Sequence, residues 1–106
     1  MYGIIRRYTP SSTLTRDDIE AFKRRIEENY VPQAQELSGF HSYTVLRAGK
    51  DMFTVSVFDS KESATESTVR AAKFVQQDPI KDQVGKPDVI EGEVLVQRER
   101  GRQFAS

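Results

Sequence analysis

Two runs rich in β-branched and aromatic residues, within Phe40 to Asp59, form the clearest pattern in the chain. They flank the pair Gly49-Lys50, and a two-residue connection that contains glycine favours a tight turn between antiparallel strands. Residues of these types favour strands because their side chains pack well on a pleated surface. The pattern predicts a β-hairpin, and the segments on either side of it have helical periodicity.

The segment before the hairpin is predicted to be a helix that covers a sheet. Thr15 is a candidate N-cap, and Asp17 and Asp18 follow in the first turn, where carboxylates complement the helix dipole. Pro32 is expected to bend or interrupt the helix, and Gly39 is expected to end it. Apolar positions recur at near-helical spacing, namely Ile19, Phe22, Ile26, Tyr30 and Leu37.

The segment after the hairpin predicts a second helix, from Lys61 to Gln77, with Ser60 as its N-cap. Its inward face has mainly small side chains, so this helix can lie close to a sheet. Asp78-Pro79 is expected to end it. Two further strands are predicted, from Tyr2 to Tyr8 and from Val89 to Gln97.

The predicted order of elements is strand, helix, strand, strand, helix, strand. Right-handed crossover connections place both helices on one face of the sheet. The fold class is therefore predicted to be α+β, a ferredoxin-like βαββαβ domain with a four-stranded antiparallel sheet in the order 4-1-3-2. Residues 1–97 are predicted to form this single domain, and residues 98–106, which include Arg98, Arg100 and Arg102, a solvated tail.

The turn at Gly49-Lys50 determines which side chains share a face of the hairpin. We assign to the helix side the pairs Leu46 with Phe53, Thr44 with Val55, and Ser42 with Val57. We assign to the open side the pairs His41 with Phe58, Tyr43 with Ser56, and Val45 with Thr54, together with Arg47 and Met52. A contiguous apolar face is rarely left open in a monomer. A second copy of the chain is therefore expected to cover this face, which predicts a homodimeric α+β barrel.

Composition narrows the chemistry. The chain has 106 residues, and its 16 basic and 16 acidic side chains give a formal net charge of zero, which does not attract nucleic acid or an anionic membrane. It contains no cysteine and one histidine, which excludes disulfides, thiolate catalysis and cysteine-ligated metals and leaves other metals short of imidazole ligands. Neither a membrane-spanning apolar run nor a cleavable leader is evident. We therefore predict a cytoplasmic protein without metal, cofactor or nucleic acid.

Nearly the whole chain, from Tyr2 to about Gln97, resembles the antibiotic-biosynthesis-monooxygenase-like superfamily of dimeric α+β barrels. The resemblance is carried by Gly39-Phe40, Tyr43 to Arg47, Phe53 to Ala64 and Glu91 to Val96. It implies that two sheets pair back to back and that a ligand-sized cavity lies between each sheet and its helices or its partner. It also implies one of two activities, cofactor-independent oxygenation of polycyclic aromatic substrates or haem degradation.

Haem degradation does not fit the residues of this chain. Relatives with that activity use an asparagine in the first strand, a tryptophan, and a histidine on the second helix. Here the first strand offers Arg6 and Arg7, the chain has no tryptophan, and the second predicted helix has no histidine. Phe58 stands where many relatives have tryptophan, which retains an aromatic wall but not the indole N–H donor.

The candidate site consists of polar and aromatic residues near the strands. His41 is the candidate catalytic residue, since imidazole titrates near neutral pH and can accept a phenolic proton. The candidates for the ligand pocket are Arg6, Tyr8, Tyr43, Ser56 and Phe58. Ordinary structural roles are also open: His41 as a partly exposed strand residue, Tyr43 as a packing residue, and Arg6 in an ion pair with Glu93 on the neighbouring strand.

Two functions follow from these residues. The protein is predicted to be a cofactor-independent monooxygenase that acts on a small aromatic or phenolic substrate, or else a non-catalytic module that binds a small apolar or phenolic ligand in the same cavity. RNA-recognition modules share the order of elements, but the zero net charge and the expected position of Phe53 on the helix side argue against that class. Acylphosphatase-like enzymes need a glycine-rich loop after the first strand, and residues 9–14 contain no glycine.

Overall fold

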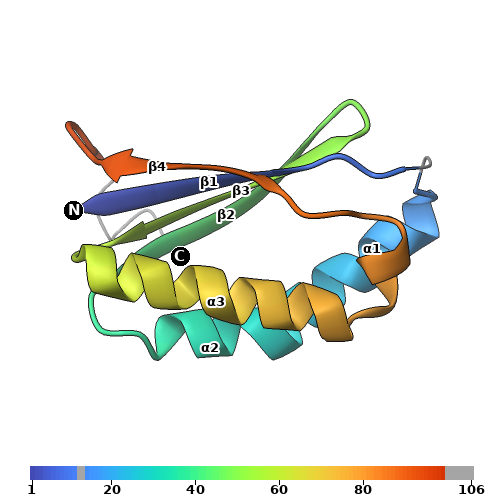
Figure 1. Cartoon of the computed structure of the whole chain (residues 1–106), viewed down its shortest axis with the longest axis horizontal. Helices are drawn as coiled ribbons and strands as arrows, with labels where there is room; N and C mark the ends of the chain where they lie inside the picture. Colours follow the sequence, from blue (N-terminus) through green and yellow to red (C-terminus); the bar gives the residue numbers. More distant parts are fainter. Residues whose placement is uncertain (12–13, 100–106) are drawn as a thin grey trace.

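The structure, a computed structural model, describes residues 1–11 and 14–99. Its elements follow the predicted order: β1 (Tyr2–Tyr8), α1 (Arg16–Arg25), the π-helix η1 (Ile26–Tyr30), α2 (Val31–Gln35), β2 (Phe40–Ala48), β3 (Asp51–Phe58), α3 (Lys61–Gln77), the 3₁₀-helix η2 (Pro79–Asp82) and β4 (Asp88–Glu93). The strands form an antiparallel sheet in the order β2-β3-β1-β4, and α1, α2 and α3 all lie on one side of it (Figure 1). The predicted ferredoxin-like α+β fold is confirmed.

The first helical segment begins and bends where local sequence signals place these features. The Thr15 side chain accepts a hydrogen bond from the Asp18 backbone, and the Asp18 carboxylate accepts one from the Thr15 backbone, which forms a capping box. Pro32 occupies the first turn of α2, where its missing N–H requires no partner. Just before it, the N–H of Val31 donates to the carbonyl of Ile26, five residues back, so the helix widens into η1.

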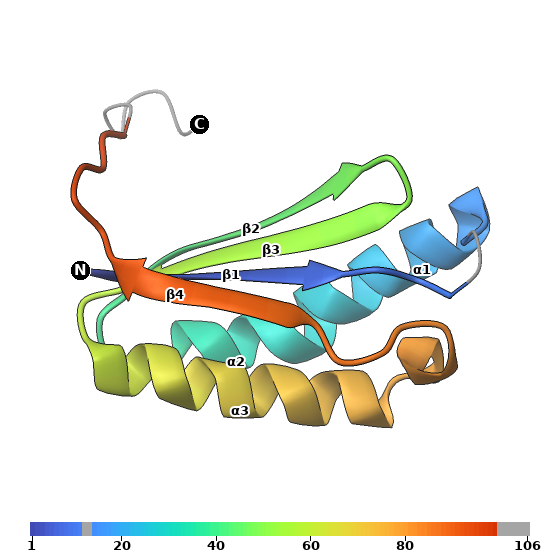
Figure 2. The ribbon, with the colours of Figure 1, turned by 45° about the horizontal axis from the view of Figure 1, so that its top comes forward.

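The second helix has the predicted bounds. Ser60 caps α3, its hydroxyl accepting from the backbone N–H of Ser63 at 3.2 Å. Asp78 ends α3 and also binds Arg25 at the end of α1, through Nε at 2.7 Å and Nη2 at 2.9 Å. Because the Asp78 side chain is buried, this two-point ion pair joins the C-terminal ends of the two main helices. Figure 2 shows these helices running beneath the strands.

The hairpin has the predicted register over most of its length. Pairing from Ser42 with Val57 to Ala48 with Asp51 is as expected, but a bulge at the start of β2 places Phe40, and not His41, opposite Phe58. This irregularity frees the His41 side chain from the cross-strand ladder. The predicted pairing of His41 with Phe58 is therefore wrong.

The last strand is shorter than predicted. It ends at Glu93, whereas the sequence pattern continues to Gln97. The Val94 N–H still donates to the carbonyl of Met1 at 2.9 Å. Of the predicted tail, residues 98 and 99 are described without regular structure, and residues 100–106 lie outside the described part of the chain.

The assignment of the two sheet faces is the reverse of the one predicted. Tyr43, Val45 and Met52 pack in the core against the helices, and Thr54, Ser56 and Phe58 are buried on the same side. Leu46, Phe53 and Val55 therefore lie on the open face. Both alternating sets contain large apolar side chains, so alternation separates the faces but does not identify the one that meets the helices. The position of Phe53 consequently no longer argues against RNA recognition, whereas the charge balance still does.

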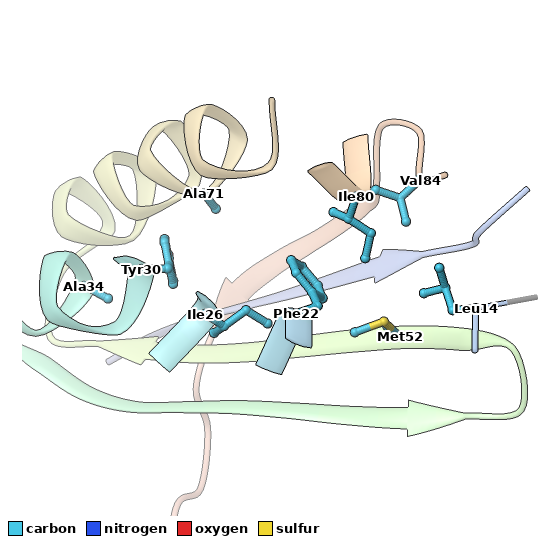
Figure 3. Packing of buried hydrophobic residues seen from close by; sticks show 9 residues of the cluster. All are labelled: Leu14, Phe22, Ile26, Tyr30, Ala34, Met52, Ala71, Ile80 and Val84. Atoms are coloured by element: carbon cyan, nitrogen blue, oxygen red, sulfur yellow. The ribbon is translucent and has the colours of Figure 1, made fainter. Parts of the chain in front are cut away.

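The main core fills the space between the helices and the sheet, as Figure 3 shows for its buried members. These members come from both helical segments, from β3 and from the region around η2: Leu14, Phe22, Ile26, Tyr30, Ala34, Met52, Ala71, Ile80 and Val84. A smaller cluster of Ile4, Phe58 and Ala64 packs near the start of β1. Among the described residues, no helix combines the length and the apolar character needed to span a membrane.

Gly39→Ala is expected to lower the free energy of unfolding by about 2 to 3 kcal/mol. At Gly39 φ is +75°, and an added Cβ would lie 2.6 Å from the Cβ of Asp59. Gly49→Ala is the matched control: φ is +62° there, but nothing lies within 4 Å of the added Cβ, so the cost should be only about 1 kcal/mol. Urea unfolding of both variants measures the difference, and equal losses would contradict the predicted clash.

Candidate functional site

Arg6 is a cation buried between the sheet and the helices. Side chains of β1 alternate, so Ile4, Arg6 and Tyr8 point toward the helix side. Arg6 is 1% exposed. Its neighbours across the sheet are Thr54 on β3 and Val89 on β4, and neither supplies a negative charge.

The guanidinium of Arg6 is only partly hydrogen-bonded. Its Nη2 donates to Oγ1 of Thr68 at 3.0 Å and to Oγ of Ser67 at 3.3 Å, both on α3. Within the part of the chain that the structure describes, its Nε and Nη1 have no hydrogen-bond partner. Within residues 1–11 and 14–99, no carboxylate forms an ion pair with Arg6. The ion pair considered with Glu93 does not form because Glu93 lies opposite Tyr2, at the other end of β1.

Two hydroxyl groups of β3 lie on the same face and also have no hydrogen-bond partner, namely Thr54 Oγ1 and Ser56 Oγ. Thr54 is directly opposite Arg6, and Ser56 is opposite Ile4. Buried polar atoms without partners are costly, and folded proteins usually satisfy them with water or a ligand. The helix-side face of β1 and β3 therefore has a strip of unsatisfied polar atoms in otherwise apolar surroundings.

Three tyrosines lie around Arg6. The ring of Tyr30 is 5.2 Å from the ring of Tyr43, and the Tyr30 hydroxyl donates to the backbone carbonyl of Ser67 at 3.2 Å. Burial raises the pKa of the Tyr8, Tyr30 and Tyr43 hydroxyls, and the nearby charge of Arg6 opposes part of that rise. At neutral pH these three groups are protonated phenols that can donate hydrogen bonds.

Two cavities meet this group of residues. A narrow internal cavity of about 30 Å³ is lined by Tyr43 and Thr54 as well as by Arg6 and Tyr8, and it has room for one water molecule. A larger groove of about 420 Å³ lies between α3, the loop after η2, and strands β1 and β4. The groove is within the usual size range of small-molecule sites. Arg6 and Tyr8 line both spaces, so the groove and the internal cavity meet at these two residues.

The structure brings together three of the predicted site residues and places the others elsewhere. Arg6, Tyr8 and Tyr43 line the internal cavity. Ser56 and Phe58 are buried on the same face, nearer the start of β1, where the Phe58 ring lies 5.8 Å from that of Phe40.

His41 lies outside both cavities. The residue is exposed, and its Nε2 is hydrogen-bonded to Oδ1 of Asp59, at the end of the sheet where β2 begins and β3 ends. The bulge in β2 that separates His41 from the regular ladder accounts for this position. The catalytic role predicted for His41 stays a prediction.

Several site residues were not singled out from the sequence. Tyr30 was interpreted as core, which it is, but its ring also forms a wall of the internal cavity. Thr68, on α3, belongs to the apolar stripe predicted for that helix, yet its hydroxyl is a hydrogen-bond partner of Arg6. The one signal available was a small polar side chain at a helical position that faces the sheet. Across the described chain, no three His, Asp or Glu side chains lie together in a way that would hold a metal ion.

The fold is shared with solved structures of low sequence identity. A candidate antibiotic biosynthesis monooxygenase from Nitrosomonas europaea is 15% identical, with a TM-score of 0.67 over 91% of this chain and 100% of that chain. HapK from Hahella chejuensis is 15% identical, with a TM-score of 0.67 over 95% and 99% of the two chains. A dimeric ferredoxin-like protein from an uncultured marine organism is 15% identical, with a TM-score of 0.66 over 94% and 100%.

Comparison with family models found no match, and no curated protein matches in sequence. The structural similarities therefore show the fold of this chain. They confirm that it resembles structures named as antibiotic biosynthesis monooxygenases over more than nine-tenths of its length.

Arg6→Met is expected to raise the free energy of unfolding of the ligand-free protein by about 1 to 3 kcal/mol. Methionine occupies the cavity wall without burying a charge, and the hydroxyls of Ser67 and Thr68 keep their hydrogen bonds to the Ala64 carbonyl. Urea unfolding measures the change.

Arg7→Met is the matched control for that variant. Arg7 is half-exposed and pairs with Asp51 at 2.6 Å, so its replacement should lower stability by no more than about 1 kcal/mol. If Arg6→Met destabilised the protein more than Arg7→Met does, Arg6 would be a stabilising residue and the interpretation of an uncompensated charge would be wrong.

Proposed function

We propose that the groove beside Arg6 binds a small aromatic phenol or enol as its anion, and that the protein is a cofactor-independent monooxygenase acting on that ligand. The observation that carries the proposal is the buried guanidinium of Arg6, with two unpartnered nitrogen atoms and no carboxylate paired with it in the described chain. A buried charge of this kind is stabilised when a ligand supplies the opposite charge. The ring of Tyr8 and the apolar side chains that line the groove, such as Val75, Val84 and Val89, favour a flat aromatic body beside it.

The proposed chemistry begins with loss of a proton from the ligand. A nearby cation lowers the pKa of a bound phenol or enol, and the low dielectric of a closed site strengthens that effect. The resulting anion delocalises onto carbon and transfers an electron to dioxygen, and the two radicals combine as a peroxide anion. This anion takes back the proton lost in the first step and becomes a hydroperoxide on a carbon that still carries hydrogen. Loss of water leaves a carbonyl group, so one oxygen atom enters the product and the other leaves as water. All the electrons come from the substrate. The shared fold with structures named as monooxygenases supports this activity.

A non-catalytic binding module is the second candidate, and one observation favours it. The residues that line the two cavities include no aspartate, glutamate or histidine, so no conventional general base faces the ligand inside. A ligand that is already acidic at neutral pH would bind there without any proton transfer. Under this alternative the same residues bind the same class of ligand, without turnover.

We also propose that a second copy of the chain covers the open face of the sheet. Ile5 is 39% exposed, Leu46 is 45% exposed and Ile90 is 68% exposed on that face, with Phe53 and Val55 half-buried between them. Apolar surface of this kind is usually covered by a partner in solution. The description of one structure with this fold as dimeric supports the proposal. The two helix-side cavities would then lie on opposite outer sides of the paired sheets.

Oxygen uptake in the presence of a panel of hydroxylated polycyclic aromatics tests the activity. Arg6→Met is expected to reduce uptake at least tenfold because it removes the charge that stabilises the anion. Arg7→Met, one residue along on the opposite face, should retain wild-type uptake. Uptake unchanged in Arg6→Met would contradict the proposal.

If no compound supports uptake but several quench tyrosine fluorescence with saturation, and Arg6→Met abolishes the quenching, the binding module is correct.

His41→Ala tests the proton-accepting role predicted for His41. A loss of uptake with unchanged affinity for the aromatic compound would support that role. Unchanged uptake would remove it and leave proton loss to solvent, assisted by Arg6.

Leu46→Glu is expected to convert a dimer of twice 12.1 kDa into a 12.1 kDa monomer, because it places a charge in the proposed apolar contact. Val69→Glu is the matched control, since Val69 is equally exposed on α3, away from the sheet. Sedimentation velocity at micromolar concentration measures both. A wild-type protein that sediments as a monomer, or a Val69→Glu variant that dissociates to the same extent, would contradict the proposed interface.

A further inference from the structure

The groove beside Arg6 has an unusual distribution of charge for a chain without net charge. Its charged lining residues are Arg6, Lys81 and Lys86, all of them cations. Among the described residues, neither lysine takes part in an ion pair. Asp82 and Asp88 are exposed in the same segment but do not line the groove. The groove therefore concentrates positive charge although the whole chain balances 16 cations with 16 anions.

The three cations of the groove differ in their exposure to solvent. Arg6 is buried, whereas Lys81 and Lys86 are exposed on the segment that links α3 to β4, which Figure 2 shows passing from the end of α3 to the edge of the sheet. The walls of the groove include the apolar side chains of Ala72, Val75, Val84, Pro87 and Val89. A ligand that fills this space lies against one buried cation, two exposed cations and an apolar wall.

From this arrangement we infer that the ligand is a two-ended acid, with a phenolic or enolic oxygen bound by Arg6 and a carboxylate bound by Lys81 and Lys86. This inference rests on the proposed binding of a phenol or enol at Arg6 and specifies the rest of the molecule. Arg6 interacts with the inner oxygen in a buried site, where salt screens little. The two lysines interact with the carboxylate at the surface, where the attraction is modest and strongly screened.

A pair of probes that differ by one group separates the two ends of the groove. The probes are 2-naphthol and 6-hydroxy-2-naphthoic acid, which share the ring and the hydroxyl and differ in the carboxylate at the far end. Titration calorimetry with the full chain is expected to give a dissociation constant about three- to tenfold lower for the hydroxynaphthoate at low salt. That preference should shrink as sodium chloride rises from about 0.05 M to about 0.5 M, while the affinity for 2-naphthol stays nearly constant.

Two double variants locate the carboxylate. Lys81→Gln with Lys86→Gln is expected to remove the preference for the hydroxynaphthoate and to leave the affinity for 2-naphthol unchanged. Lys61→Gln with Lys73→Gln removes the same number of charges from exposed positions of α3 that do not line the groove, and it should preserve the preference.

Each remaining outcome overturns a defined part of the account. If wild-type protein binds both probes equally, or if the preference survives in the Lys81 and Lys86 variant, the second acidic site is absent. In that case binding of 2-naphthol that is lost in Arg6→Met still supports the proposed function. If neither probe binds, this inference and the proposed binding of phenols at Arg6 both fail.

Discussion

The organisation of this protein depends on one buried positive charge. The alternation of β1 turns Arg6 toward the helices together with Ile4 and Tyr8, into a space from which water is largely excluded. Only two hydroxyl groups of α3 accept from it, and each of these also donates to the carbonyl of Ala64. A buried guanidinium that has no counterion and only some of its hydrogen bonds lowers the stability of the folded state by several kcal/mol. We therefore attribute the buried charge to the proposed ligand and not to a gain in stability.

The composition of α3 connects this charge to the shape of the site. The helix buries small residues, Ala64, Ser67 and Ala71, along the side that faces the sheet, which allows it to lie close to β1 and β3. On the neighbouring stripe of the same helix, Thr68, Ala72 and Val75 line the groove beside Arg6. Small side chains on one helix therefore provide close packing on one stripe and an open space on the next. The opposite face of the sheet takes no part in this site and is available for contact with a second copy.

Local sequence signals were sufficient to predict the elements of the fold. The capping residues Thr15 and Ser60, the bend at Pro32 and the turn at Gly49-Lys50 all act within a few residues, and each was found where the sequence placed it. The order of the strands followed from connection rules. Relations between distant segments were harder to predict. The two faces of the hairpin are both apolar, so tertiary packing, such as that of Tyr43 against Tyr30, decides which one meets the helices.

The candidate site was predicted only in part, because its geometry also depends on contacts between distant segments. Arg6, Tyr8 and Tyr43 were identified as polar or aromatic residues on the predicted strands, and the structure brings them together. The partner of Arg6 was not predictable, because the register of β1 with β4 is set by tertiary packing and places Val89, not Glu93, beside it. The bulge that separates His41 from the ladder has no local signature that would distinguish it from a regular strand start.

A crystal structure of the protein with 2-naphthol tests the central claim most directly. The account predicts that the naphthol oxygen lies within hydrogen-bond distance of Nε or Nη1 of Arg6, with the ring between Tyr8 and the apolar wall of the groove. A structure in which ordered water satisfies both nitrogen atoms, while the naphthol binds elsewhere or not at all, would contradict it.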